Sequence, residues 1–425
     1  MSQSPTPVSE ETARFHRIIE QGDVAELQLA LKNGSPVNAA GRNGSTALLL
    51  AIASKDLEKV KLLINHGADP ELTDDFNVTP LRHAVDWDFV DGVQFLLSLG
   101  VDRGFQPKYP LKKVNRDFEL PAVEMPEALK QVMSDAEWKQ SIEETRKSLR
   151  ELDLNPQVEP VISGVQSVDV LRLFIQAGDD LNLAPNEVKR ALLGLETGGG
   201  LRSAMSDYQM HKSPRFGNRN PERMDVAFWR DMIRTGGNAY SARSHFGDEE
   251  AFTHPGAVWC FDRFGSSLTQ LEDGRFVQIG GEHEDYYDPD FFIYNDVVIH
   301  DGKGDFEIYG YPRDVFLPTD FHSATLCGDS IYVVGCLGYP EQRQQGFTPV
   351  YRLTLESWQI EAVKTSGEMP GWIHKHRARY DAARNTICIA SGEIHIIGDK
   401  EEQNLIPTND RFELDLTSLK WRKVK

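Results

Sequence analysis

The chain of 425 residues lacks most of the features that mark secreted, membrane-spanning or metal-organised proteins. It has four cysteines, and no two of them stand at the spacing of a metal-binding or redox pair. No apolar run approaches the roughly 18 residues that a membrane span requires. The amino terminus also lacks the apolar core of a secretory signal. These absences predict a soluble, cytoplasmic protein whose cysteines are reduced and lie in its core.

Basic residues are also scarce. The sequence holds 46 lysines and arginines against 65 aspartates and glutamates, which gives a formal net charge of −19. Phosphate binding depends on clustered basic side chains, so this balance argues against a nucleic acid partner and against an anionic membrane surface. Because complementary fields speed encounter, an acidic chain predicts a protein partner with a basic surface.

Recognised catalytic motifs are missing as well. The sequence contains no GxSxG nucleophile elbow, no P-loop, no GxGxxG and no HExxH. We therefore expect no catalysis and no cofactor. Whether the chain is an enzyme stays open, because only an analogy of fold would support that idea.

A period of 33 residues dominates residues 43–102. The matching pairs are Thr46 and Thr79, Ala51 and Ala84, Leu63 and Leu96, and Gly67 and Gly100. A fixed period of this length marks a stack of short units, each of which buries its apolar face only against its neighbours. Such stacks present extended binding surfaces, so the period favours a binding function over catalysis.

Each repeated residue has a physical role. Thr79 is placed to cap a helix, and Pro80 fits the first turn because its missing N–H would be unused there. Val93 and Leu96 lie on one face of a second helix, which Gly100 ends in a left-handed conformation. This pattern strongly resembles the ankyrin repeat, which implies a helical solenoid that binds proteins.

Further copies flank these two. One lies upstream around Gly34 and lacks the typical start, as expected of a terminal capping repeat. A half-repeat follows at residues 167–182, out of period because residues 103–166 intervene. Within this insertion, apolar residues from Trp138 to Leu152 step by three and four, which predicts a helix packed on the stack.

From about Phe264 the sequence changes to short strands. Three stretches share one layout, in which an apolar strand, a glycine, a long loop and a second strand follow one another. The apolar strands are 276–279, 331–334 and 387–390. This layout resembles the kelch repeat of β-propellers, whose blades have four strands. Three units are fewer than a closed propeller uses, so we expect an incomplete ring, or one completed by residues 225–263 or by another chain.

The expected fold class is therefore multidomain α plus β, with an amino-terminal ankyrin-type helical solenoid and a carboxyl-terminal kelch-like antiparallel β-sheet domain. The predicted parts are a disordered tail (1–12), ankyrin repeats (13–102), a helical insertion with a degenerate repeat (103–197), a flexible loop (198–224) and the kelch-like domain (225–425).

The resemblance implies that finger turns and first helices line a concave binding face. Aromatic and arginine side chains are favoured anchors of such interfaces. The predicted partner-binding residues are Asp74, Asp75, Phe76, Asn77, Arg82 and Trp87. For Phe76 and Trp87, packing against neighbouring repeats is an alternative. The leading function is that of a non-enzymatic interaction or scaffold protein.

Two other functions stay open, and both concern the loop GEHEDYYDPD. Carboxylates beside imidazoles suit zinc, manganese or iron, which would make the chain a metal-dependent enzyme. The residues of that site would be His283, Glu284, Asp288 and His322. Otherwise these histidines form hydrogen bonds within the blades. A sugar-binding module is the other alternative, in which aromatic side chains stack on the ligand. Those side chains are Tyr286, Tyr287, Phe291 and Phe292.

Overall fold

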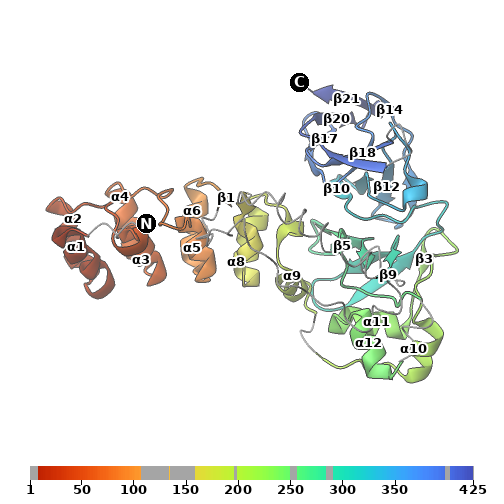
Figure 1. Cartoon of the computed structure of the whole chain (residues 1–425), viewed down its shortest axis with the longest axis horizontal. Coiled ribbons are helices and arrows are strands. Elements are labelled where there is room, and N and C mark those ends of the chain that lie inside the picture. The colour runs from red at the N-terminus through yellow and green to blue at the C-terminus, as the bar shows by residue number, and fades with distance from the viewer. Residues whose placement is uncertain are drawn as a thin grey trace. The chain divides into compact units, whose positions relative to one another are not determined.

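A computed structural model describes residues 8–106, 134, 158–195, 199–248, 256–283, 291–397 and 403–424. The chain divides into two compact units, Met1–Pro185 and Asn186–Lys425. The first unit is helical and the second is rich in antiparallel sheet (Figure 1), which confirms the α plus β class. Across the described part of the chain, none of the helices has the length and apolar character that crossing a bilayer requires.

Pairs of antiparallel helices build the first unit. They are α1 (Glu10–Gln21) with α2 (Val24–Lys32), α3 (Ala47–Ala53) with α4 (Leu57–Asn65), and α5 (Pro80–Asp86) with α6 (Val90–Ser98). Thr79 accepts a backbone N–H from the helix that follows, as predicted, and Thr46 does the same for α3. The predicted disordered tail is wrong at its end, because Ser9 caps α1 and residues 10–12 are helical.

An interrupted fourth unit ends this stack. Its elements are β1 (Gly104–Phe105), β2 (Glu159–Pro160), the 3₁₀ helix η3 (Val161–Gly164) and α8 (Val168–Gln176). The strands β1 and β2 pair with each other, η3 packs against α5, and α8 packs against α6. The predicted half-repeat at 167–182 therefore completes the stack. The insertion leaves and rejoins the array at this finger, and its predicted helix lies outside the described residues.

Three mainly antiparallel sheets form the core of the second unit. The first sheet has the order β3-β9-β8-β5-β4, the middle sheet β10-β11-β12-β13 and the third sheet β14-β21-β20-β17-β16. In the first sheet the strands are β3 (Glu222–Arg223), β4 (Ser267–Gln270), β5 (Phe276–Ile279), β8 (Val297–His300) and β9 (Phe306–Gly310). In the middle sheet they are β10 (Ser323–Cys327), β11 (Ser330–Val334), β12 (Val350–Thr354) and β13 (Ile360–Ala362). In the third sheet they are β14 (Ser366–Gly367), β16 (Arg377–Asp381), β17 (Thr386–Ala390), β20 (Arg411–Asp415) and β21 (Lys420–Val424).

The three apolar strands predicted from the sequence are β5, β11 and β17. Smaller strands pair outside the three sheets. They are β6 (Glu282–His283) with β7 (Phe292–Ile293), and β18 (Glu393–Ile397) between β15 (Trp372–His374) and β19 (Gln403–Pro407). Among the described residues the strands form open sheets, and no closed barrel is present.

The middle sheet packs on both of its neighbours. Successive side chains of a strand point to opposite faces, so Val333 contacts the first sheet beside Val277, whereas Val334 contacts the third sheet beside Ile387. All five residues of β11 are buried. Two apolar cores therefore share one sheet, and each excludes water from it.

Helices cover the other side of the first sheet (Figure 1). They are α9 (Asn186–Leu192), α10 (Met205–His211), α11 (Ala227–Thr235) and α12 (Ala239–Phe246). The Arg230 guanidinium lies 4.8 Å from the ring centre of Phe306. The predicted flexible loop 198–224 is wrong here, because Tyr208 of α10 stacks on Phe246 with ring centres 4.4 Å apart. The predicted insertion also ends too late, since α9 belongs to the second unit.

Candidate functional site

Asp74 organises the finger between α4 and α5. Its Oδ1 accepts the N–H groups of Phe76 and Val78, both at 2.9 Å. Its Oδ2 lies 3.1 Å from His83 Nε2 on α5. One carboxylate thus closes the turn and ties it to the following helix, so the contacts of Asp74 lie within the array.

Asn77 and Arg82 also form contacts inside the array. Asn77 has a φ of 61°, and its Nδ2 donates to the carbonyl oxygen of Gln106 at 3.2 Å. Arg82 Nε donates to Asp86 Oδ1 at 2.6 Å, and the guanidinium lies 4.7 Å from the ring centre of Phe105. Both side chains therefore connect the finger and helix of this repeat to neighbouring structure.

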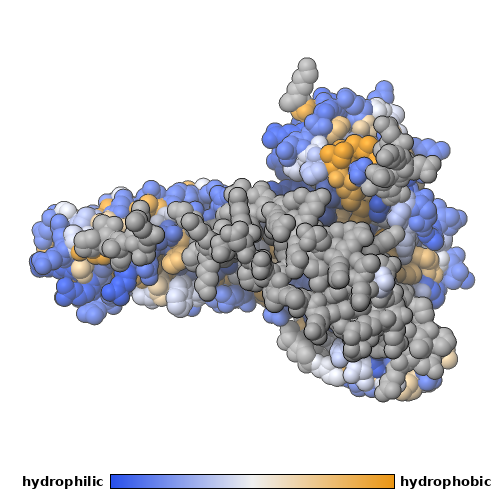
Figure 2. All heavy atoms as spheres, viewed as in Figure 1, coloured by the Kyte–Doolittle hydropathy of each residue, from blue (hydrophilic) through white to orange (hydrophobic). Residues whose placement is uncertain are grey.

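Asp75, Phe76 and Trp87 are the predicted residues that remain open to solvent. Phe76 is 43% exposed and Trp87 is 51% exposed. The described surface of the helical unit drawn in Figure 2 is mostly hydrophilic, so two exposed aromatic rings are unusual there. Trp87 follows α5, a helix of seven residues that is about 10 Å long. The finger and Trp87 therefore stand at opposite ends of α5.

Of the predicted metal residues, His283 and His322 belong to the described part of the chain. His322 is buried and both of its ring nitrogens face hydroxyl groups, the nearer being Ser267 Oγ at 2.8 Å from Nε2. His283 is buried in β6. Glu284 and Asp288 lie outside the described residues. Within those residues no group of three or more histidine, cysteine or acidic side chains could hold a metal ion.

The hydrogen bond of His322 has a counterpart one sheet later. His376 Nε2 lies 2.8 Å from Ser323 Oγ. Each bond joins the residue that precedes the edge strand of one sheet (β10 or β16) to the edge strand of the preceding sheet (β4 or β10). Burial lowers the pKa of His322 to about 3 and that of His376 to about 4, so both rings are neutral at pH 7. The alternative to a metal site was that the histidines form hydrogen bonds within the blades, whereas these two bonds join neighbouring sheets.

The proposed sugar-stacking aromatics have partners of their own. The ring of Phe291 meets Tyr339 edge-on at 5.8 Å, and the ring of Phe292 stacks on Phe216 at 5.4 Å. Residues 286–287 lie outside the described residues. The rings of Phe291 and Phe292 therefore pack against other side chains of the protein.

A pair of acidic side chains that the sequence did not reveal lies between the sheets. Glu282 follows the first sheet's β5, and Asp320 precedes the middle sheet. Asp320 is fully buried, and its Oδ1 accepts the N–H of Gly338 at 2.7 Å. Burial and the neighbouring Asp320 raise the pKa of Glu282 to about 8, although Lys375 opposes the shift. Burial also raises the pKa of Asp320, and at pH 7 Glu282 keeps its proton.

A second buried group lies beside this pair. His374 is fully buried, and its Nε2 stands 3.6 Å from Glu393 Oε2. Lys375 Nζ reaches the same carboxylate at 3.4 Å. Burial, assisted by Lys375, lowers the pKa of His374 to about 3. His374 and Glu393 stand directly opposite each other in the pairing of β15 with β18.

Comparison with known proteins identifies the helical unit. Residues 15–105 match the family model for ankyrin repeats, in three copies. Residues 15–105 are ankyrin repeats. Repeats of this kind present extended concave surfaces to other proteins, which implies a protein partner for this unit.

Three curated relatives share short stretches with the chain. L-asparaginase of Dirofilaria immitis is 44% identical over 63 residues, which are 15% of this chain and 11% of that protein. Protein phosphatase 1 regulatory subunit 27 is 35% identical in Mus musculus and 36% identical in Homo sapiens, over 86 residues in each case. Those residues are 20% of this chain and 56% of either relative. The chain thus spans between about a tenth and just over half of the relatives it matches.

The acidic pair predicts a pH dependence of stability. The folded-state pKa of Glu282, about 8, exceeds its ordinary value of 4.5. Between these values the unfolded chain has released the proton that the folded chain keeps, so the free energy of unfolding should fall as pH rises from 4.5 to 8. Glu282→Gln should flatten this decline and stabilise the chain at pH 8 by on the order of 2 kcal/mol.

Chemical denaturation at several pH values measures this effect. Glu356→Gln, at an exposed position, is the matched control and should leave the pH profile of the original chain unchanged. Parallel profiles for Glu282→Gln and the original chain would show that the proton on Glu282 does not affect stability.

The repeated histidine bond predicts a local effect. Ser323→Ala leaves His376 Nε2 without its hydroxyl partner, which should cost about 1 kcal/mol. Amide hydrogen exchange in β10 and β16 should therefore become about fivefold faster. Ser213→Ala, at an exposed serine, should change neither strand. Equal exchange in the two variants would mean that the bond contributes nothing to sheet packing.

Proposed function

We propose that this chain is a non-enzymatic interaction protein that binds a partner protein through its ankyrin repeats, with Asp75, Phe76 and Trp87 in the contact. The observation that carries the proposal is the exposure of 43% of Phe76 and 51% of Trp87. Elsewhere in the same stack Phe15 and Phe174 are buried. Exposed aromatic rings flanked by polar surface are the usual anchors of protein interfaces.

Charge supports a basic partner surface. Asp75 is exposed, and no described side chain forms an ion pair with its carboxylate. The neighbouring Asp74 is occupied by the finger turn and His83, so its charge is less available. With a net charge of −19, the chain attracts a basic protein over distance, and the exposed carboxylate beside Phe76 orients it on contact.

We also propose that residues 225–425 form a kelch-like domain with three blades, beside ankyrin repeats at 13–102 and the half-repeat. The support is threefold. Each sheet contains four antiparallel strands that lie side by side in chain order (β4-β5-β8-β9, β10-β11-β12-β13 and β16-β17-β20-β21), the sheets pack face to face, and the bond between a histidine and a serine recurs. Helices cover the free face of the first sheet, and charged side chains occupy the free face of the third sheet. The array of three blades therefore ends on both sides, which suits a scaffold that binds partners through the ankyrin repeats and through this domain.

The relatives support the class of function and leave the partner open. One is, by name, a regulatory subunit of protein phosphatase 1, and another is an asparaginase. Since proteins with such different names share similar stretches with this chain, the likeness favours a binding module over any single activity. All four cysteines are free thiols, which fits the cytoplasmic location that the sequence predicts.

The finger proposal is tested with a paired substitution. Asp75→Lys with Phe76→Ala should weaken binding of the partner recovered by affinity capture at least tenfold, because it removes an aromatic anchor and reverses a charge (about 1.4 kcal/mol or more). The dissociation constant, measured with purified partner, checks the expectation.

The control makes the same kinds of change elsewhere on the stack. Leu29→Ala with Glu20→Lys alters an exposed leucine and an exposed glutamate, and it should leave binding unchanged. If the finger variant binds as well as this control, the interface lies on another surface.

A further inference from the structure

The third sheet ends the array with an exposed face. One face of this sheet packs on the middle sheet through side chains such as Ile387 and Phe412. The pairing register places other side chains together on the opposite face, called the outer face here. Its central rows are Arg377, Ala390 and Arg411, then Arg379, Cys388, Glu413 and Arg422.

At one position of the outer face, the third sheet differs from the other two sheets. The first residue of the edge strand is Ser267 in β4 of the first sheet and Ser323 in β10 of the middle sheet. Each of these serines meets a histidine that precedes the next sheet. In the third sheet the same position is Arg377. The position that joins successive sheets has therefore become a charged, exposed one.

One acidic side chain of the outer face is already neutralised. Glu413 is 7% exposed, and its Oε1 accepts from Arg384 Nη1 at 2.8 Å while Oε2 accepts from Arg422. Against the opposing effect of burial, these hydrogen bonds lower the pKa of Glu413. The carboxylate thus stays ionised and is matched by two arginines.

Three other guanidinium groups of the face are free. Arg377, Arg379 and Arg411 are exposed, and none of them forms an ion pair or hydrogen bond with a described residue. Free positive charges are notable in a chain whose net charge is −19. These arginines create a positive field close to the face, which the acidic remainder of the chain weakens over longer distances.

The spacing of these groups suits an extended anionic chain. Arg377 and Arg379 are two residues apart on β16, or about 7 Å, and Arg411 lies two strands away from Arg377, or about 10 Å. Ala390 and Cys388 between them are small, so a backbone can approach the sheet closely. Carboxylates at alternate residues of an extended segment have the same spacing of about 7 Å.

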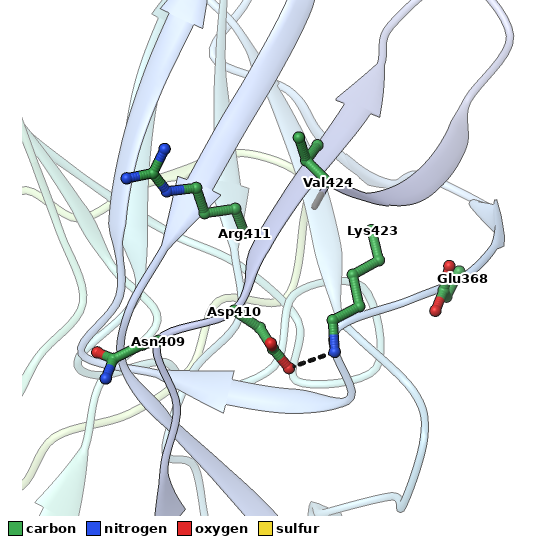
Figure 3. Close-up of a pocket in the computed structure, with 6 residues that line it drawn as sticks. All are labelled: Glu368, Asn409, Asp410, Arg411, Lys423 and Val424. Carbon is green, nitrogen blue, oxygen red and sulfur yellow. Dashed lines mark hydrogen bonds and ion pairs between the residues drawn. The ribbon is translucent and has the colours of Figure 1, made fainter.

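A hollow lies beside Arg411. It has a volume of about 480 Å³. Its lining residues are Glu368, Asn409, Asp410, Arg411, Lys423 and Val424. Figure 3 shows Arg411 pointing away from the ion pair of Asp410 with Lys423, whose atoms are 2.6 Å apart. The Arg411 guanidinium therefore keeps its charge available at the rim of the hollow.

We propose that the outer face of the third sheet binds an extended acidic segment of a partner protein. Carboxylates at alternate residues would pair with Arg377 and Arg379, and a further one with Arg411, since guanidinium groups bind carboxylates in a bidentate manner. A nucleic acid fits less well, because the face has no aromatic ring to stack a base and the acidic remainder repels a long polyanion. This surface is independent of the ankyrin finger.

The test uses the full chain and a labelled peptide in which glutamate and serine alternate over about ten residues. Fluorescence anisotropy at about 50 mM salt, where screening is weak, should show binding that a peptide with glutamine for glutamate lacks. Arg377→Glu with Arg411→Glu should weaken binding at least about tenfold. The milder Arg377→Gln with Arg411→Gln guards against a folding defect and should weaken it several-fold.

A control with the same charge change separates the face from the net charge. Arg219→Glu with Lys364→Glu alters two exposed basic residues away from the outer face and should bind within about twofold of the original chain. The finger variant Asp75→Lys with Phe76→Ala should also keep peptide binding. Equal loss in both charge-reversed pairs, binding of the glutamine peptide, or tighter binding of an oligouridylate of equal charge would each overturn the proposal.

Discussion

The burial of the middle sheet on both faces is the contact on which the second unit depends. Val333 and Val334 are neighbours in β11, yet each lies in a different apolar core. A polar side chain at either position would lose its hydration without gaining a partner, which costs more than a single lost contact. The outer sheets need only one apolar face each, and this leaves their second faces available for helices or for solvent.

The same logic governs the ankyrin stack, where each unit is stable only against its neighbours. The fourth unit also depends on packing against its neighbour. Although its inner helix is replaced by the single turn of η3, α8 still packs on α6 and covers it. The insertion therefore interrupts the chain at a finger, where few apolar contacts are lost, and the repeat still ends on a packed helix.

Periodicity predicted much of the fold, and contacts distant in sequence account for the rest. Thr79 as a cap and β11 as an apolar strand follow from local patterns. Helix α10 does not, because seven residues between glycine and proline gain stability only when Tyr208 joins aromatic rings from α11 and α12. In the finger, Asn77 looked free for a partner, yet it bonds to Gln106, 29 residues away. No local pattern pairs Glu282 with Asp320 either.

Both proposed surfaces occupy places where a repeated unit departs from its own pattern. Repeated positions are constrained by packing, as Thr46 and Thr79 show by capping equivalent helices. Phe76 and Arg377 are not held in this way, because each projects from a rigid repeat without filling a core. Packing already holds the backbone at these positions in place. When such a side chain binds a partner, the backbone therefore loses little conformational freedom. The packed, repeated residues of each array thus hold the backbone that carries the exposed side chains Phe76 and Arg377.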